Sequence, residues 1–273
     1  MWHIDVEFKK PRARLFLWNE DTRQMSKLKI ANYTMLWTEI NWVPLVVNGT
    51  LHFTYSFDPL RVIQCPDLDQ YPIIWCHMVY MASEDPTYKF NEWIDAFRGG
   101  SPWVHYEENY YISFAHTHYQ YIKEMTSNES FVEGGIYSAN MAVLKVVPGP
   151  TPTFRIVYIS DPMLFNHRLL RSGDITRSKS INWPFVFPVG VILRNRDVAD
   201  IGVHVNDARG FILRFHGLIN LMDQVIETDS RNIQSTMLDE NSDQSQPELG
   251  LVHKLAREGA IKLRETEQSE SFP

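Results

Sequence analysis

Residues 41–65 read NWVPLVVNGTLHFTYSFDPLRVIQC and carry the clearest local structural signal in the chain. Residues 45–47 are a short apolar run, and Asn48-Gly49 follows as a two-residue turn signal. Asn-Gly is typical of hairpin turns, because both residues tolerate positive φ. Apolar and polar residues then alternate over 51–55, and the pair at 62–63 indicates a further strand. The stretch therefore predicts a β-hairpin followed by a third strand.

The same pattern recurs later in the chain. At 101–116 and again at 187–207, a proline opens a short apolar strand, a turn follows, and a longer strand ends in polar residues. Proline is tolerated at the start of a strand, where its missing N–H does not break the ladder. The spacings from Pro44 to Pro102 and on to Pro188 correspond to propeller blades of ~40–50 residues with insertions. We expect an all-β fold, either a β-propeller or a domain with three unrelated hairpins.

Length and charge narrow the class of protein. With 273 residues the chain can bury a sizeable core, in one large β domain or two smaller ones. Its formal net charge of −7 argues against nucleic-acid binding, which needs a basic face. No stretch reaches the ~18 consecutive apolar residues of a membrane span. Because the N-terminus lacks a charged leader followed by an apolar core, we expect no signal peptide and take the cytoplasm as the default compartment.

Cysteines and glycosylation sequons also bear on the compartment. Cys65 and Cys76 cannot form a zinc site alone, and they would pair only in an oxidising compartment, so we expect free buried thiols. Asn-x-Ser/Thr sequons begin at Asn32, Asn48 and Asn128. They matter only if the chain enters the secretory route. The sequence leaves this question open.

The remaining segments fit the all-β prediction until the composition changes near the C-terminus. Strands are predicted at 14–18, 28–30, 73–80, 137–147 and 154–160, and a helical turn is predicted at 88–97. Because the chain opens directly into repeat material, we expect part of the first blade to be missing. We divide the chain into a propeller domain, residues 1–226, and a solvated acidic tail, residues 227–273. Within the tail we expect disorder over 230–250 and a short helix at 251–263.

Ligands of propeller enzymes bind near the axis, where the polar ends of the inner strands converge. The candidate site residues at the repeat ends are Asn41, Trp42, Asp58, Arg61, Arg98, Gly99, Gly100, Ser101, His116, His118, Asn206 and Asp207. Arg98 can hold an anion through a bidentate contact, and the glycines after it let backbone N–H groups approach. A plain loop at this position is the alternative.

Other candidates also have a structural alternative. His116 and His118 place two imidazoles on one strand face, but no third ligand is evident, so we expect no metal. Trp42 and Trp103 are either sugar-stacking platforms or buried aromatic residues. Asp58-Pro59 and Asp161-Pro162 are typical starts of turns.

Four short motifs in the same order resemble a known group of carbohydrate enzymes. EINWVP at 39–44, followed by NGTLHFTYSFDP at 48–59, resembles a Glu-Lys-Asn-Trp-x-Pro…Tyr-Ser-x-x-Pro segment. That segment belongs to five-bladed β-propeller proteins related to glycoside hydrolase family 130, the β-mannoside phosphorylases and hydrolases, and to related mannosyltransferases.

The later motifs extend the resemblance over residues 37–215. RGGSP at 98–102, with His116 closing the next strand, is similar to the Arg-Gly-Gly-Ser…Gly/Ala-His element of that family. FPVG at 187–190 and GVHVND at 202–207 resemble its Phe-Pro-x-Gly…Tyr-Gly-Val-Asn-Asp ending.

The resemblance implies a five-bladed β-propeller with a glycan site on its axis. In the phosphorylases one aspartate is the general acid, and phosphate attacks the anomeric carbon with inversion. By position, Arg98 would hold an anion or a sugar hydroxyl, while Asn41, His116 and Asp207 would hydrogen-bond the glycan. The implied partner is a glycan or a sugar phosphate, with inorganic phosphate or a sugar donor as co-substrate and no other cofactor.

The chain departs from the family at the catalytic acid. The family aspartate lies in a Glu-Asp-Pro-Arg-Leu-Phe segment, whereas the alignable residues 11–16 read PRARLF and hold no carboxylate. Asp85, in a later Glu-Asp-Pro string, is treated as a decoy, and Ile40 replaces the family lysine. A glycosidic bond is hard to break without a proton donor.

Two hypotheses follow. The first is a glycan-active enzyme, a glycosyltransferase or a glycoside phosphorylase or hydrolase acting on mannose-type glycans, with Asp207 as a weak candidate for the acid. The second is a catalytically inactive propeller that binds glycans or a protein partner. The two differ in whether Asp58, Asp85, Asp161 or Asp207 lies within reach of a bound sugar.

Overall fold

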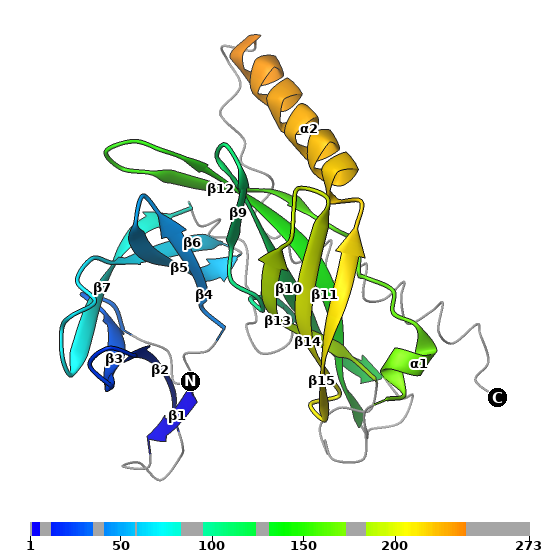
Figure 1. The fold of residues 1–273 in the computed structure, drawn as a ribbon, viewed down its shortest axis with the longest axis horizontal. Coiled ribbons are helices and arrows are strands. Elements are labelled where there is room, and N and C mark those ends of the chain that lie inside the picture. Colours follow the sequence, from blue (N-terminus) through cyan, green and yellow to red (C-terminus); the bar gives the residue numbers. More distant parts are fainter. Residues whose placement is uncertain are drawn as a thin grey trace.

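The computed structural model describes residues 2–5, 12–34, 41–57, 59–82, 95–123, 131–172 and 184–238. These residues are mostly β-strand, and the strands form three curled sheets from which one long helix projects (Figure 1). The predicted all-β class is confirmed at this level. In the described part of the chain, no helix is both long and apolar enough to cross a membrane.

The first sheet has seven strands in the order β1-β2-β3-β7-β6-β5-β4. The strands are β1 (Trp2–Asp5), β2 (Arg12–Asn19), β3 (Gln24–Ile30), β4 (Val43–Val47), β5 (Thr50–Phe57), β6 (Leu60–Cys65) and β7 (Ile73–Met81). β4 to β7 form an antiparallel meander, while β3 joins β7 in parallel. Asn48 and Gly49 have φ of 49° and 75°, so the predicted Asn-Gly hairpin is confirmed, as are the other strands predicted here.

A disulfide joins Cys65 of β6 to Cys76 of β7, so the expectation of free thiols is wrong. The cause is the register, which pairs Gln64 with His77 and so sets the two cysteines opposite each other. Both cysteines are buried in the cluster formed by Leu28, Ile74 and their apolar neighbours in this sheet.

The second sheet is built on two long strands, β10 (Tyr110–Lys123) and β11 (Phe131–Val147). β12 (Thr153–Ile159) pairs with β11, while β8 (Asp95–Arg98) and β9 (Val104–Glu107) both pair with β10. All pairings are antiparallel. The strands predicted at 137–147 and 154–160 are confirmed.

The predicted helical turn at 88–97 is wrong over 95–97, because these residues belong to β8 and pair with β10. Phe97 of β8 is buried, and packing against the neighbouring sheet outweighs the weak local preference. Residues 88–94 lie outside the described part of the chain.

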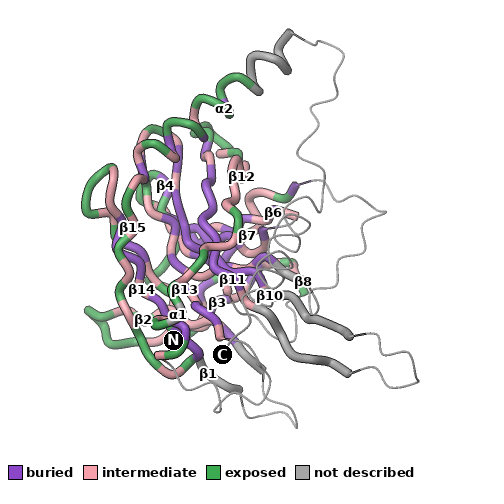
Figure 2. Tube along the Cα trace, turned by 90° about the vertical axis from the view of Figure 1, so that its right-hand side faces the viewer, coloured by how far each residue is buried: buried purple, intermediate pink, exposed green. Residues whose placement is uncertain are grey.

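The third sheet is an antiparallel meander of β13 (Val186–Leu193), β14 (Val198–Val205) and β15 (Arg209–His216). The first two strands were predicted and the third was not. A short helix, α1 (His167–Leu170), precedes this sheet, and α2 (Leu218–Leu238) follows it. The largest hydrophobic cluster lies between the second and third sheets and includes the inner face of α2. Figure 2 shows the buried residues gathered along the central strands.

Helix α2 corrects part of the prediction for the C-terminal segment. It covers residues 230–238, for which disorder was expected, and the boundary drawn after residue 226 falls inside it. Leu218, Met222 and Val225 are buried at helical spacing, so the helix forms because one face packs against the sheets. The rest of the tail, including 251–263, lies outside the described residues.

Candidate ligand-binding site

The segment Arg98-Gly99-Gly100-Ser101 crosses the place where the three sheets meet. A Cβ at Gly99 would lie 1.9 Å from Cγ2 of Val43 and 2.7 Å from the carbonyl oxygen of Asn41. A Cβ at Gly100 would lie 2.6 Å from the carbonyl oxygen of Pro188. These close approaches account for both glycines without a ligand.

Ser101 continues this junction. Its Oγ accepts a 2.8 Å hydrogen bond from the Phe114 N–H, and its own N–H donates to the Phe114 carbonyl at 2.8 Å. Ser101 is fully buried, as is Ser113, whose hydroxyl donates to the Ser101 carbonyl at 2.7 Å. The hydroxyl of Ser101 is therefore part of the packing between strands.

Both candidate tryptophans are buried. Trp103 is 5 % exposed, and its Nε1–H donates to Thr54 Oγ1 at 2.9 Å. Trp42 is 7 % exposed and lies edge-on to Phe53 and Tyr55. This burial agrees with the structural alternative stated for these two residues.

Two histidines on β10 meet a tyrosine on β11. The register of the two strands sets His118 opposite Tyr137, and their ring centroids are 4.6 Å apart. His116 lies on the same face of β10, with its ring 5.9 Å from that of Tyr137. On the other side, the ring of Phe187 from β13 lies 4.2 Å from that of His116.

Phe185, just before β13, completes the group, with its ring 5.1 Å from that of Tyr137. We call this group the His–Tyr cluster; it consists of His116, His118, Tyr137, Phe185 and Phe187. Only the two histidines were predicted as site residues. Phe187 lies in a motif that the sequence singles out, but Tyr137 and Phe185 carry no local signal, because strand pairing alone brings them here.

Two further predicted residues act electrostatically on this cluster. Arg98 closes β8 directly opposite His116 in the register. Burial raises the pKa of Tyr137, the charge of Arg98 opposes that rise, and the charge of Asp207 adds to it. Arg98 and Asp207, which come from β8 and the turn after β14, therefore both act electrostatically on the phenol of Tyr137.

Both imidazoles of the cluster are neutral at pH 7. Burial, together with the charges of Arg98 and His118, lowers the pKa of His116 to about 3, although a hydrogen bond with the Gly99 backbone acts in the opposite direction. Burial and then Arg98 lower the pKa of His118 to about 4. A neutral imidazole offers one donor and one acceptor. Among the described residues, the buried Nδ1 atoms of both histidines have no hydrogen-bond partner.

The remaining predicted residues lie apart from this cluster or serve the backbone. Asn206 is 3 % exposed; its side chain accepts from the Phe185 N–H at 2.8 Å and donates to the Leu170 carbonyl at 2.9 Å. Arg61 is half-buried on β6 of the first sheet, and Asp161 is exposed just after β12. Asp58 and Asp85 lie outside the described residues.

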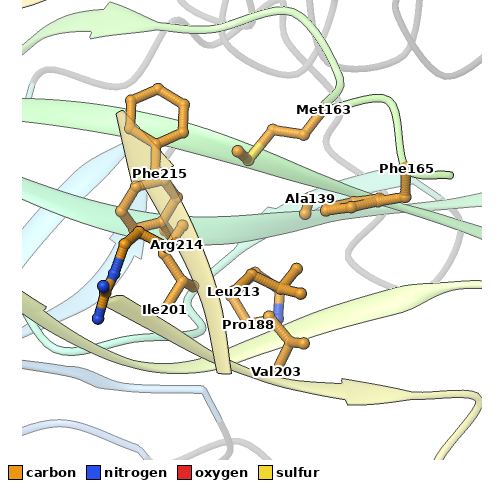
Figure 3. Close-up of a pocket in the computed structure, with 10 residues that line it drawn as sticks. Ala139, Met163, Phe165, Pro188, Ile201, Val203, Leu213, Arg214 and Phe215 are labelled. Carbon is orange, nitrogen blue, oxygen red and sulfur yellow. The ribbon is translucent and has the colours of Figure 1, made fainter. Parts of the chain in front are cut away.

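A cavity of about 180 Å³ lies next to the His–Tyr cluster, between the second and third sheets (Figure 3). Its lining comprises Phe114, Ala139, Met163, Phe165, Pro188, Ile201, Val203, Leu213, Arg214 and Phe215. Ala139 is the strand partner of His116, so cavity and cluster share one face of the second sheet. The one charged lining group, Arg214, is bonded to Asp200 at 2.7 and 3.1 Å. The cavity therefore suits an apolar group.

Within the described ranges, no three His, Cys, Asp or Glu side chains lie close enough together to hold a metal ion. Comparison with known proteins adds no assignment, since no protein-family model and no curated protein matches the chain.

Proposed function

We propose that the chain is a carbohydrate-active protein, glycosyltransferase-like or glycoside phosphorylase/hydrolase-like, that binds mannose-type glycans at the His–Tyr cluster. The observation that carries this proposal is the His–Tyr cluster itself, in which the rings of His116, His118 and Tyr137 meet beside Arg98, the strand partner of His116. Arg98 and His116 belong to one motif of the family resemblance and are strand partners, and the charge of Asp207, from another motif, also acts on Tyr137.

The chemistry of the cluster suits a polyhydroxylated ligand. Two neutral imidazoles can exchange hydrogen bonds with hydroxyl groups without selecting for charge. Arg98 adds a permanent positive charge for a phosphate or a sugar hydroxyl. The rings of Tyr137 and Phe187 offer apolar surface of the kind that amphipathic ligands contact.

Strand topology supports the finer proposal of a five-bladed β-propeller. Propeller blades are antiparallel four-stranded sheets placed around an axis. β4 to β7 form a four-stranded antiparallel meander within the seven-stranded first sheet. A second blade would consist of β10, β11 and β12, with β8 and β9 together in the place of its remaining strand. β13, β14 and β15 would provide three strands of a third blade.

A catalytically inactive glycan-binding or protein-binding propeller is the second candidate. The observation that favours it is the segment aligned with the family's general acid. That segment overlaps the start of β2, and its residues 11–16 hold no carboxylate. The enzyme hypothesis then depends on Asp207, which is exposed in the turn after β14.

Calorimetric titration of the purified chain with methyl mannosides, mannobiose and mannose 1-phosphate tests the proposal. Arg98→Ala should weaken binding about 10- to 100-fold, since hydrogen bonds to a charged group contribute about 1.5–3 kcal/mol. Arg196→Ala is the matched control, because Arg196 is exposed and pairs with Glu107. Absence of binding to every sugar by well-folded protein would overturn the carbohydrate assignment.

Turnover assays with Asp207→Asn then separate enzyme from binder. Asp207 has φ of 51°, a conformation that asparagine also tolerates, so the turn should persist. An enzyme that uses Asp207 as its acid should lose turnover and keep sugar affinity. A wild-type chain that binds mannosides but turns none over, with phosphate or a sugar nucleotide present, identifies the inactive binder.

A further inference from the structure

Two of the three sequons lie in exposed turns of the first sheet. Asn48-Gly49-Thr50 makes the tight turn from β4 into β5, and Asn48 is exposed at its tip. Asn32-Tyr33-Thr34 follows β3; Asn32 has φ of 55°, and both Asn32 and Thr34 are exposed. Asn128, the third sequon asparagine, lies outside the described residues.

The same sheet holds the Cys65–Cys76 disulfide. Disulfides form and persist in oxidising compartments, and proteins of the reducing cytosol rarely keep them. Sequons become glycosylated in the secretory route, which is such a compartment. The disulfide and the exposed sequons are separate features of the chain, and they indicate the same environment.

We propose that the chain matures in an oxidising secretory compartment and carries N-linked glycans on Asn48 and Asn32. This replaces the cytoplasmic default and is independent of the proposed function. In the transfer, the side-chain nitrogen of asparagine forms a bond to the anomeric carbon of an oligosaccharide carried on a lipid pyrophosphate. The bond from that carbon to the pyrophosphate oxygen breaks, the lipid pyrophosphate leaves, and the amide loses one proton. The two thiols meanwhile give two electrons and two protons to a disulfide-bearing oxidant.

The folded structure accommodates a glycan at each turn. A glycan is bulky and hydrophilic, so its asparagine must project into solvent after folding. Asn48 meets this requirement at the end of β4, the last strand in the order of the first sheet, beside Val46, which is 57 % exposed. Asn41 lies just before the other end of β4, and at ~3.3 Å per residue the strand separates its two ends by about 16 Å. A glycan on Asn48 would therefore project away from the end at which Asn41 lies.

The test uses protein isolated from the cells that produce it. Peptide N-glycosidase in H₂¹⁸O converts a glycosylated asparagine to ¹⁸O-labelled aspartate, which peptide mass spectrometry detects. We expect label at Asn48 and Asn32, and no alkylation of Cys65 or Cys76 in denatured, unreduced protein. Label at either asparagine that appears only when the glycosidase is present supports the proposal, because Asn48-Gly49 can also take up ¹⁸O by spontaneous deamidation. Two unlabelled asparagines, or cysteines that alkylate without reduction, would overturn it.

Matched variants identify each acceptor without disturbing its turn. Thr50→Ala and Thr34→Ala remove a sequon and leave the asparagine in place, whereas Thr50→Ser and Thr34→Ser keep it. Each alanine variant, produced in the native cells, should lose one glycan's mass relative to its serine partner. Serine and alanine variants with equal masses at both positions would contradict the assignment.

Discussion

Two buried polar clusters in this molecule have opposite hydrogen-bonding states. The first surrounds Asp229 of α2, which is 4 % exposed. It accepts hydrogen bonds from the Tyr110 hydroxyl at 2.9 Å and from Lys145 Nζ at 2.7 Å, and it also pairs with Arg155. Burial alone would raise the pKa of Asp229, but these hydrogen bonds and positive charges outweigh it, and the pKa is lowered.

The His–Tyr cluster is organised differently. Its rings pack in stacked and tilted arrangements, yet the Nδ1 atoms of His116 and His118 have no hydrogen-bond partner in the described part of the chain. Burial here favours the neutral form instead of a charge. A buried polar atom without a partner lowers stability, so each such atom requires an explanation. The Asp229 cluster fastens α2 to the second sheet, and the His–Tyr cluster retains unused hydrogen-bonding capacity that a ligand can satisfy.

Removing the carboxylate of Asp229 should have the largest effect on stability. Asp229→Ala leaves Lys145 and Arg155 without their shared partner, and breaking a buried pair costs about 3–5 kcal/mol. Urea denaturation measures the change. Glu227→Ala, two residues earlier on the same helix, is the matched control, since Glu227 and Arg231 are 63 % and 72 % exposed and their ion pair contributes ~1 kcal/mol or less. Equal losses in both variants would contradict the distinction between the clusters.

Gly100, which lies next to the His–Tyr cluster, should contribute to stability because no larger residue fits at its position. Gly100→Ala places a methyl group against the carbonyls of Pro188 and Phe114, which are backbone atoms and cannot turn away. We expect a loss of about 1–3 kcal/mol in the free energy of unfolding, the range typical of overpacking. Gly190→Ala, where a Cβ would meet nothing within 4 Å, is the control. A stable Gly100→Ala protein that loses only ligand binding would show that the motif serves the ligand alone.

The two clusters should respond to acid in different pH ranges. His116 is neutral in the folded protein down to about pH 3, whereas the unfolded chain takes up its proton near 6.5, so stability should fall as the pH drops below 6.5. For one such group, the free energy of unfolding should fall by about 1.4 kcal/mol for each unit that the pH drops. Asp229, whose pKa is below 3.8 when folded, contributes stability that is lost only below that pH.

Denaturant titrations from pH 7 to 3 separate these contributions. His116→Phe should reduce the dependence of the free energy of unfolding on pH between pH 6.5 and 4. Asp229→Ala should change this dependence only at the acid end of the range. His105→Phe, at an exposed position on β9, is the control. An unchanged slope in His116→Phe would show that the imidazole is protonated in the folded protein.

The smallest effect should come from a single hydroxyl. Tyr137→Phe keeps the ring contacts with His118 and Phe185 and removes only the phenolic oxygen. Stability should change by less than ~1 kcal/mol, and sugar affinity should fall about tenfold, as expected for one hydrogen bond. Calorimetric titration with the mannoside that binds most tightly measures the change in affinity. Unchanged affinity would place the sugar away from this phenol.

Sequence reasoning succeeded where the signal is local. Asn48-Gly49 fixes a turn through backbone conformation alone, and the alternating strand beside it needs no distant partner. Arg98 and His116 were selected through an ordered motif, and the strand register sets them opposite each other, near one further residue of the cluster. The residue itself, Tyr137, was missed because it joins the site only through the pairing of β10 with β11.

Other errors have the same origin. Asp229 lies in an acidic segment and was assigned to a solvated tail, but its partners Tyr110 and Lys145 are 119 and 84 positions away. Gly99 and Gly100 also accommodate the backbone of distant segments, at Asn41, Phe114 and Pro188, which no local pattern reveals. Cys65 and Cys76 pair because of strand register, which composition does not reveal.

The position of Asp229 so late in the chain also affects how the protein emerges from the ribosome. Hairpins of the first sheet join neighbours in sequence, so β4 to β6 can assemble soon after they are synthesised. The second sheet has all its strands once residue 159 has emerged, but the acceptor for Tyr110, Lys145 and Arg155 arrives 70 residues later. Until then, these side chains have no buried counter-charge to pack around. We expect the nascent second sheet to remain accessible to chaperones until α2 has been translated.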